Sequence, residues 1–564
     1  MDYHTNLRTN TSRLHTRLIE GLYRPSAPAR LLREKSKGLC RQIVLPSIDD
    51  SIVLQRLSDS FFFAIRGKTP SPNAYFEPDN FVFSTRDRGL YGSFAAWLHF
   101  HNKLIDISNI SDYVVVTDIA NYYDHISYDN LRNIISTSIS VSETVLDLLI
   151  FILSELSWQP DYMPRIPIGL PQIDLDAPRV LAHAFLFDLD KYAISKVGDK
   201  YTRYIDDINF GTESIAEAKG IIRDVDILLH ARQVRLNSGK TNIFTAAGAQ
   251  NYLRVSDHRA VDSLLADLAM RRATGSDVSA LGSRIESEIR TKYRNGDFDV
   301  GHGDKVLKRY ISLAKDIGAG IHADILRDCL RRRPSCRESV LSYIATRPLD
   351  RDTIVILDNF VRFPELVDDV SILLAAKALV GMQATARSVT RSHLVSMASW
   401  LATKGPWGLY GGLWMLSKYG TNGDLLNLLV ARSADCFAEP LLARLAGALY
   451  QRFQGSPEAA EYNGLVVGSG SPAALAAMRF QRAVVSSNTA ALSIRPFISA
   501  PNPSLSTGLL HSKFLLLLGV LRNEAVSLGE KRRLIARHPM AWRDAFYRSL
   551  AIEAAPHNLR SRIV

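Results

Sequence analysis

The chain of 564 residues is longer than one hydrophobic core usually supports, so we expect two or three domains. Its 46% hydrophobic and 22% charged residues exclude an intrinsically disordered chain. The formal net charge of +11 favours an anionic partner such as nucleic acid, although this excess is modest for the length.

The cysteines and apolar segments favour a soluble protein of the cytoplasm. Four cysteines lie scattered, without the spacing of a zinc site, and so few do not suggest a disulfide framework. The segment Met1–His4 lacks the apolar core of a signal peptide. The strongest apolar run, Phe514–Leu518, is too short to span a bilayer, so no membrane partner is expected.

A β-branched run that ends in an acid is the first strong signal after an expected N-terminal helical extension, residues 1–34. The run Asp112–Asp118 predicts a buried strand that places Asp118 at its end. The following segment, Ile119–Ile126, predicts a turn into a helix. Taken alone, Asp118 is explained equally well as a cap of that helix.

Two adjacent aspartates stand between two strand-like segments further along the chain. Lys200–Gly211 contains Tyr204-Ile205-Asp206-Asp207, with apolar and polar residues roughly alternating on both sides. This pattern predicts a β-hairpin with both carboxylates at or near its turn. Two acids held so close repel each other, and oxygen ligands suit Mg²⁺ as the neutralising ion.

The three aspartates together predict a site for phosphoryl transfer. Asp118 can join Asp206 and Asp207 if their strands are neighbours in one sheet. Three carboxylates around two metal ions are what in-line transfer requires, since one ion activates the attacking 3′-hydroxyl and the other stabilises the leaving pyrophosphate.

Five motifs in the right order resemble those of reverse transcriptases. They are a start of the fingers at Ile43–Pro46 and Asp49–Val53, a first catalytic motif at Asp118–Ile126, a Gly-x-Pro-Gln turn at Ile168–Gln172, an Arg-Tyr-x-Asp-Asp motif at Arg203–Asp207 and a lysine-bearing segment at Leu236–Thr241. The resemblance covers roughly residues 35–255 and implies a fingers and palm domain of α/β type.

The resemblance also implies a role for each matching residue. Two Mg²⁺ ions would be held by Asp118, Asp206, Asp207 and the carbonyl of Ile119. Lys240 would protonate the pyrophosphate, unless it is an ordinary solvated lysine.

Other matching residues would contact the substrate. Tyr123 would stack under the sugar and exclude a 2′-hydroxyl, with a core aromatic as the alternative. Gln172 would contact the nascent base pair. Four basic residues of the fingers-like part are candidates for binding phosphates, although a surface charge explains each one better when it is taken alone: Arg66, Lys68, Arg86 and Arg88.

The sequence after Gln172 departs from ordinary reverse transcriptases. Ile173 replaces the usual glycine, which puts normal template contacts in doubt. The turn is followed by Arg179-Val180-Leu181-Ala182, which is similar to the abortive-infection reverse transcriptases, the AbiK-like group of bacterial defence enzymes. We therefore place Arg179 among the substrate-binding candidates. No primer-grip or thumb signature follows Lys240.

Residues 256–564 show leucine, alanine and arginine at helical spacing, with short breaks between the segments. They predict an all-α region of HEAT-like repeats in place of a thumb, and an irregular helical domain is the alternative. Gly455–Ser471 and Pro496–Gly508 are expected to be loops or a boundary within this region. The aromatic residues Trp407, Tyr410, Trp414 and Tyr419 are expected in the core, with base stacking as the alternative.

The sequence thus favours a Mg²⁺-dependent DNA polymerase of the reverse-transcriptase superfamily. From the resemblance we expect a role in antiphage defence, dNTP substrates, a homo-oligomer, and synthesis that is untemplated and primed from a protein hydroxyl, with DNA attached covalently. One alternative is a templated enzyme that copies a dedicated non-coding RNA. Another is a non-catalytic nucleic-acid-binding scaffold.

Overall fold

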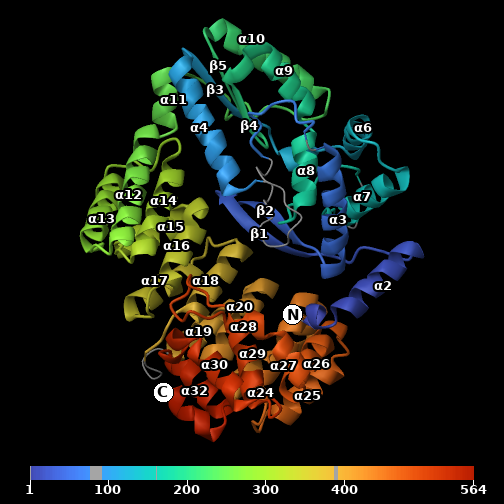
Figure 1. Ribbon diagram of the computed structural model, residues 1–564, viewed down its shortest axis with the longest axis vertical. Coiled ribbons are helices and arrows are strands. Elements are labelled where there is room, and N and C mark those ends of the chain that lie inside the picture. The colour runs from blue at the N-terminus through green and yellow to red at the C-terminus, as the bar shows by residue number, and fades with distance from the viewer. Residues whose placement is uncertain are drawn as a thin grey trace.

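The structure, a computed structural model, describes residues 2–65, 67–76, 92–159, 162–164, 166–385 and 391–563. These residues form mostly helices, with two small antiparallel sheets in the N-terminal half and helices alone in the C-terminal half (Figure 1). The expected order of an α/β part followed by an all-α part is confirmed at this level. Among the described helices, none is long and apolar enough to cross a membrane.

A four-stranded sheet lies at the centre of the N-terminal half. Its strands run in the order β4-β5-β3-β6, and their bounds are β3 Tyr113–Asp118, β4 Tyr201–Tyr204, β5 Asp207–Thr212 and β6 Asn242–Thr245. Successive side chains of β3 point to opposite faces, and both faces are covered. Val114 packs against α4 (Phe94–Ile110), whereas Val115 belongs to the larger core on the other face. A run of β-branched residues suits a strand buried on both sides.

Further helices of this half surround the sheet. They are α3 Ile48–Ile65, α5 Tyr122–His125, α6 Tyr128–Ser138, α7 Glu143–Leu156, α8 Asp176–Ala184, α9 Phe187–Val197, α10 Ile215–His230 and α11 Ala246–Tyr252. The first two helices, α1 Asp2–Thr5 and α2 Leu7–Ile19, lie away from the sheet and toward the all-α region (Figure 1). Helices α9 and α10 lie at the far end of the sheet from the all-α region (Figure 1).

The expected helical extension over residues 1–34 is wrong in its last part. Strand β1 (Ala29–Ser36) crosses that boundary and pairs with β2 (Leu39–Leu45). The two-residue turn between them, Lys37-Gly38, has positive φ at both positions, as a type I′ turn requires. Half of the residues of β1 are exposed and half are charged, so its sequence lacks the apolar alternation by which a strand is recognised.

The hairpin β1–β2 connects the sheet-containing half with the all-α region. The buried guanidinium of Arg337 forms ion pairs with Glu34 of β1 and with Asp368. The indole nitrogen of Trp407 donates to the carbonyl of Arg30 at 2.7 Å. The hairpin therefore lies between the two halves, as Figure 1 also shows.

Helices follow one another throughout the all-α region, and one large hydrophobic core runs through them from Val261 to Ile563, beside a small cluster of Ala345, Ala378 and Leu505. Their bounds are α12 Val255–Thr274, α13 Ser279–Arg294, α14 Gly303–Ile317, α15 Ala323–Arg332, α16 Arg337–Ala345, α17 Arg351–Val361, α18 Asp369–Gly381, α19 Arg391–Leu401, α20 Gly405–Tyr419, α21 Asn422–Ala431, α22 Ser433–Ala438, α23 Pro440–Ala448, α24 Tyr450–Phe453, α25 Ala459–Gly468, α26 Pro472–Ser486, α27 Asn488–Ser493, α28 Arg495–Ser499, α29 His511–Arg522, α30 Leu528–Ala536, α31 Pro539–Trp542 and α32 Ala545–Ala554.

The packing order changes along this region. From α12 to α20 the even-numbered helices form a stack, in which each packs against the second helix after it. From α20 onward the stack continues through every third helix, namely α23, α26, α29 and α32. The helices between them lie along the sides of the stack, and the number of helices per repeat therefore changes along the chain.

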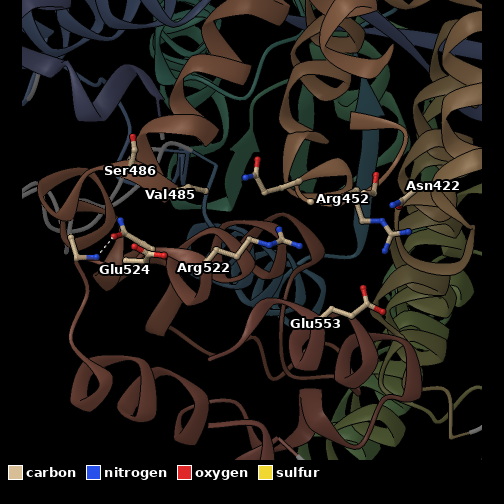
Figure 2. Close-up of a pocket in the computed structure, with 12 residues that line it drawn as sticks. Asn422, Arg452, Val485, Ser486, Arg522, Glu524 and Glu553 are labelled. Carbon is tan, nitrogen blue, oxygen red and sulfur yellow. Dashed lines mark hydrogen bonds between the residues drawn. The ribbon is translucent and has the colours of Figure 1, made fainter. Parts of the chain in front are cut away.

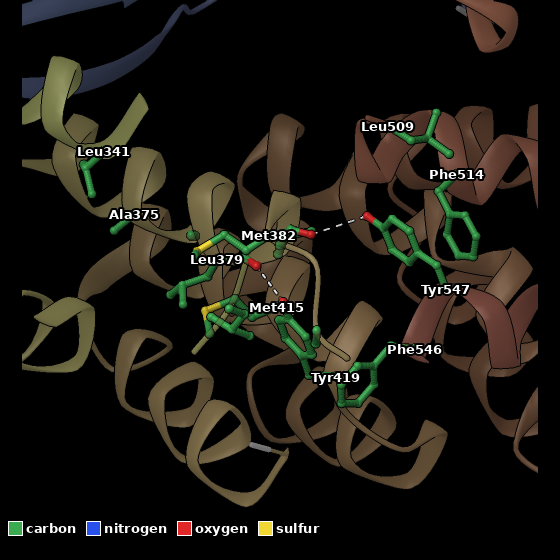
Figure 3. Packing of buried hydrophobic residues seen from close by; sticks show 14 of the residues in the cluster. Leu341, Ala375, Leu379, Met382, Met415, Tyr419, Leu509, Phe514, Phe546 and Tyr547 are labelled. Carbon is green, nitrogen blue, oxygen red and sulfur yellow. Dashed lines mark hydrogen bonds between the residues drawn. The ribbon is translucent and has the colours of Figure 1, made fainter. Parts of the chain in front are cut away.

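Aromatic residues join the successive layers of this core (Figure 3). The Tyr419 hydroxyl donates to the carbonyl of Leu379 at 2.5 Å, and the Tyr419 ring meets Phe546 edge to face. The expected core position of Tyr410, Trp414 and Tyr419 is confirmed, since these residues of α20 lie within or against this core. Trp407 is also buried, but it lies outside this cluster and donates to the hairpin β1–β2. The expected loop at Gly455–Ser471 is wrong, because it contains α25, whose apolar residues pack on the core despite flanking glycines. Similarly, α28 occupies the start of the second expected loop.

Candidate functional site

Two of the three predicted aspartates face each other across neighbouring strands. Asp118 is the last residue of β3 and pairs in register with Asp207, the first residue of β5. Asp206 lies in the two-residue turn that joins β4 to β5, as the sequence predicted. The other turn residue, Ile205, has a φ of 55°, which is unfavourable for a β-branched side chain. This strained turn places Asp206 beside the other two carboxylates.

A buried ion pair between Arg203 and Asp190 supports that turn. Arg203 is 0% exposed and donates from Nε and from NH2 to the two oxygens of Asp190, at 2.7 and 2.5 Å. Its NH1 donates to the carbonyl of Ile205 at 3.0 Å. Tyr201 also donates to Asp190, at 2.7 Å. The position of the aspartate turn thus depends on one fully buried guanidinium.

Burial and neighbouring carboxylates disfavour the charged forms of Asp206 and Asp207. Burial, and then the charges of Asp207 and Asp118, raise the pKa of Asp206 from 3.8 to about 6. Burial also raises the pKa of Asp207, with Asp118 adding to the shift. Oδ1 of Asp118 is buried without a hydrogen-bond partner in the part of the chain that the structure describes. A buried carboxylate oxygen with no donor is a position that a cation would stabilise.

Lys240 provides a positive charge at this cluster. Its ammonium forms an ion pair with Oδ2 of Asp118. Burial alone would lower the pKa of Lys240, but the bond to Asp118 and the neighbouring aspartates raise it overall. The backbone of this segment is fixed to β3, since Asn237 N donates to the Asp118 carbonyl at 2.8 Å and the hydroxyls of Thr241 and Thr117 lie 2.7 Å apart.

The donor set is suited to a hard divalent ion. All three acids offer carboxylate oxygens, which Mg²⁺ prefers over nitrogen or sulfur. With Lys240 paired to Asp118, however, the described residues contain no group of three or more acidic, histidine or cysteine side chains already arranged around a metal position. The chemistry of Asp118, Asp206 and Asp207 still fits Mg²⁺. While Lys240 is paired with Oδ2 of Asp118, Oδ1 of the same carboxylate has no hydrogen-bond partner among the described residues and is open to an ion.

A cavity of about 750 Å³ opens over the carboxylates. Tyr123 and Gln172 lie in its wall, as the substrate contacts expected from the sequence should. The turn before Gln172 is tied to α5, because Leu170 N donates to the Tyr123 carbonyl at 2.7 Å. The carbonyl of Gln172 in turn accepts a bond from Val44 N of β2 at 2.9 Å. The cavity is therefore built from the sheet, the turn and the hairpin β1–β2.

The other residues expected at the site lie in varied surroundings. Ile119 lines the cavity, and its N–H donates to the Asp206 carbonyl at 3.3 Å. Arg179 forms an ion pair with Asp174 at 2.5 Å. Burial raises the pKa of Tyr123, and the charge of nearby Arg179 lowers it by a smaller amount. The Lys68 ammonium donates to the Ser138 carbonyl at 2.5 Å. The remaining basic candidates, Arg66, Arg86 and Arg88, lie outside the described residues.

The structure adds three basic residues that the sequence reasoning missed. Lys35 and Arg41 of the hairpin line the cavity, and alternation along β2 would have been the only local signal for Arg41. Lys305 comes from α14 of the all-α region, and its charge opposes the raised pKa of Asp207. Burial lowers the pKa of Lys305, while its ammonium lies 3.2 Å from Nε2 of His302. No local pattern connects a lysine on a distant helix with these aspartates.

A comparison with models of known protein families finds no match for this chain, and a search of curated proteins finds no relative. The interpretation of the site therefore rests on its residues and their geometry.

Proposed function

We propose that this protein is a nucleotidyltransferase that adds deoxynucleotides to a 3′-hydroxyl, at a site formed by Asp118, Asp206 and Asp207. The observation that carries this proposal is the register of β3 and β5, which brings Asp118 opposite Asp207 with Asp206 in the adjoining turn. These carboxylates would hold two Mg²⁺ ions, whose positive charge would help to deprotonate the 3′-hydroxyl and stabilise the leaving pyrophosphate.

The chain's own residues supply the other parts of such a reaction. Lys240 lies at the carboxylates and keeps its proton, as a general acid for the leaving pyrophosphate must. Lys35 and Arg41 add positive charge to the same cavity, where triphosphate oxygens would lie. Tyr123 in the wall would contact the sugar and discriminate against a 2′-hydroxyl.

Within this proposal the sheet and its helices are the palm of a reverse-transcriptase fold, and α12–α20 are a HEAT-like solenoid. Packing of each even-numbered helix on the second helix after it supports the solenoid, because stacked helix pairs produce that pattern. Antiphage defence, homo-oligomers and protein-primed synthesis rest on the resemblance to abortive-infection reverse transcriptases.

Incorporation by an aspartate variant tests the proposal. Purified protein is incubated with Mg²⁺ and each labelled dNTP in turn, and we expect product from the wild type and none from Asp206→Asn with Asp207→Asn. Asp147→Asn, which alters an exposed carboxylate on α7, is the matched control and should retain activity. A folded double variant that still incorporates label would refute the assignment.

The same assay separates untemplated synthesis from copying of an RNA. Label that shifts on a denaturing gel after protease and resists pretreatment with RNase indicates protein-primed, untemplated synthesis. Label that depends on intact RNA indicates a templated enzyme. Absence of product from the wild type under all these conditions would favour a non-catalytic scaffold.

A further inference from the structure

A second large cavity lies in the all-α region, away from the carboxylates. It has a volume of about 760 Å³ and lies among the ends of α24, α26 and α29 and the start of α21 (Figure 2). A smaller cavity of about 190 Å³ adjoins it, since four residues line both: Asn422, Arg452, Arg522 and Glu553. The combined recess is in the size range of pockets that hold small organic ligands.

Two arginines from different helices converge at the junction of these cavities. Arg452 is 7% exposed, and its NH2 donates to the carbonyl of Gly420 at 3.1 Å. Arg522 donates from NH1 to the carbonyl of Gln451 at 2.5 Å. Figure 2 shows both guanidinium groups and the carboxylate of Glu553 directed toward the same space. Arg391 joins them in the wall of the smaller cavity.

The charge of Arg522 is only partly compensated by the protein. Burial lowers its pKa, and the charge of Glu553 acts in the opposite direction. Its guanidinium donates to the carbonyl and to the side-chain oxygen of Gln451, neither of which carries a charge. A partly buried guanidinium whose acceptors are uncharged is a favourable partner for an anion.

The walls also carry uncharged hydrogen-bonding groups. Oγ of Ser456 is buried at the large cavity without a hydrogen-bond partner in the described ranges, which indicates a group that a ligand can satisfy. Asn422 contributes an amide, and Glu553 can accept bonds from hydroxyl or amino groups. Inorganic phosphate would fill only a small part of this space and would leave these groups unused.

We propose that this recess binds a nucleoside phosphate, with its phosphate on Arg452 and Arg522 and its sugar and base toward Ser456 and Asn422. Arginine suits this task because its planar donors match phosphate oxygens in pairs. A free nucleotide and the 5′-phosphate end of an oligonucleotide both carry a phosphate attached to a sugar and a base, so either could be the ligand. The proposal does not depend on polymerase activity, since the recess and the carboxylate site share no lining residue.

Calorimetric titration of the full chain tests the site. ATP and dATP are titrated in the presence of a chelator, so that metal-dependent binding at the aspartates does not contribute. We expect saturable binding that Arg522→Gln weakens at least tenfold, equivalent to about 1.4 kcal/mol. Arg532→Gln, an exposed arginine of α30, is the matched control and should bind like the wild type. Unfolding curves establish that each variant is folded.

Arg522→Lys provides a second variant if the glutamine variant does not fold. It keeps the charge but loses the paired donors, so we expect affinity between those of the wild type and Arg522→Gln. Tighter binding of a 5′-phosphorylated oligonucleotide than of its unphosphorylated form, lost in the same variants, would support the phosphate assignment and identify the strand end as its source. Equal affinity for inorganic phosphate and ATP, or binding that the Arg522 variants leave unchanged, would overturn the proposal.

Discussion

Replacement of Arg203 by glutamine should destabilise the fold more than replacement of any exposed arginine. The guanidinium and its partner Asp190 are both 0% exposed and share two hydrogen bonds. Arg203→Gln leaves the Asp190 carboxylate buried with Tyr201 as its remaining partner. Breaking a buried pair in this way costs about 3–5 kcal/mol, which is a large part of the total stability of an ordinary domain.

Urea unfolding of matched variants measures this cost. Arg290→Gln removes an exposed pair with Glu286 and should change the free energy of unfolding by less than about 1 kcal/mol. The double variant Arg203→Gln with Asp190→Asn should lose less than the two single variants summed, because neither partner is left charged and alone. We also expect Arg203→Gln to reduce incorporation, since the Ile205 carbonyl loses a donor beside Asp206.

Two results would refute this reasoning. If Arg203→Gln costs no more stability than Arg290→Gln, the buried pair does not hold the hairpin. If the single-variant losses are additive, Arg203 and Asp190 do not act as a pair.

Three further predictions concern charges at the carboxylate site. Because the folded protein raises the pKa of Asp206 from 3.8 to about 6, its ionisation opposes folding. Metal-free protein should therefore lose roughly 3 kcal/mol of stability as pH rises through this interval. A pH titration of unfolding should show this decline in the wild type and a smaller one in Asp206→Asn, where the raised pKa of Asp207 remains. Above pH 6, Mg²⁺ should raise the melting temperature of the wild type more than that of the variant. Lys240→Ala should slow incorporation about 10²–10⁴-fold if Lys240 is the general acid, whereas exposed Lys219→Ala should not, and equal rates would remove this role. Lys305→Met should shift the acidic limb of the pH–rate profile to higher pH, because Lys305 lowers the pKa of Asp207. An unmoved profile would show that Lys305 has no electrostatic effect on the site.

The central strands and the aspartate turn were predictable because local sequence determines them. A run of three valines suits one buried strand, and two acids between alternating segments mark a hairpin turn. The pairing of these elements in space was harder to predict. The register that pairs Asp118 with Asp207 follows from packing on both faces of β3, to which α4 and the larger core contribute.

Strand β1 and the position of Lys305 could not be predicted from the sequence, because both depend on tertiary contacts. Half of β1 is exposed, and its charged residues resemble a solvated segment. Its pairing with β2 and its contact with Arg337 are tertiary effects. Lys305 reaches the carboxylates only because α14 lies beside the sheet-containing half. The change of packing period at α20 likewise has no signature in the helical spacing.

The docking of the hairpin β1–β2 means that the two halves of this protein are not independent modules. Lys35 and Arg41 of the hairpin form part of the cavity over the aspartates, while Glu34 on the same hairpin pairs with Arg337 of the all-α region. A fragment that ends before α12 would keep all three aspartates but lose the support of this wall. Such a fragment should not retain the activity of the intact chain, and a protein with a single cut between the halves should stay associated through the hairpin.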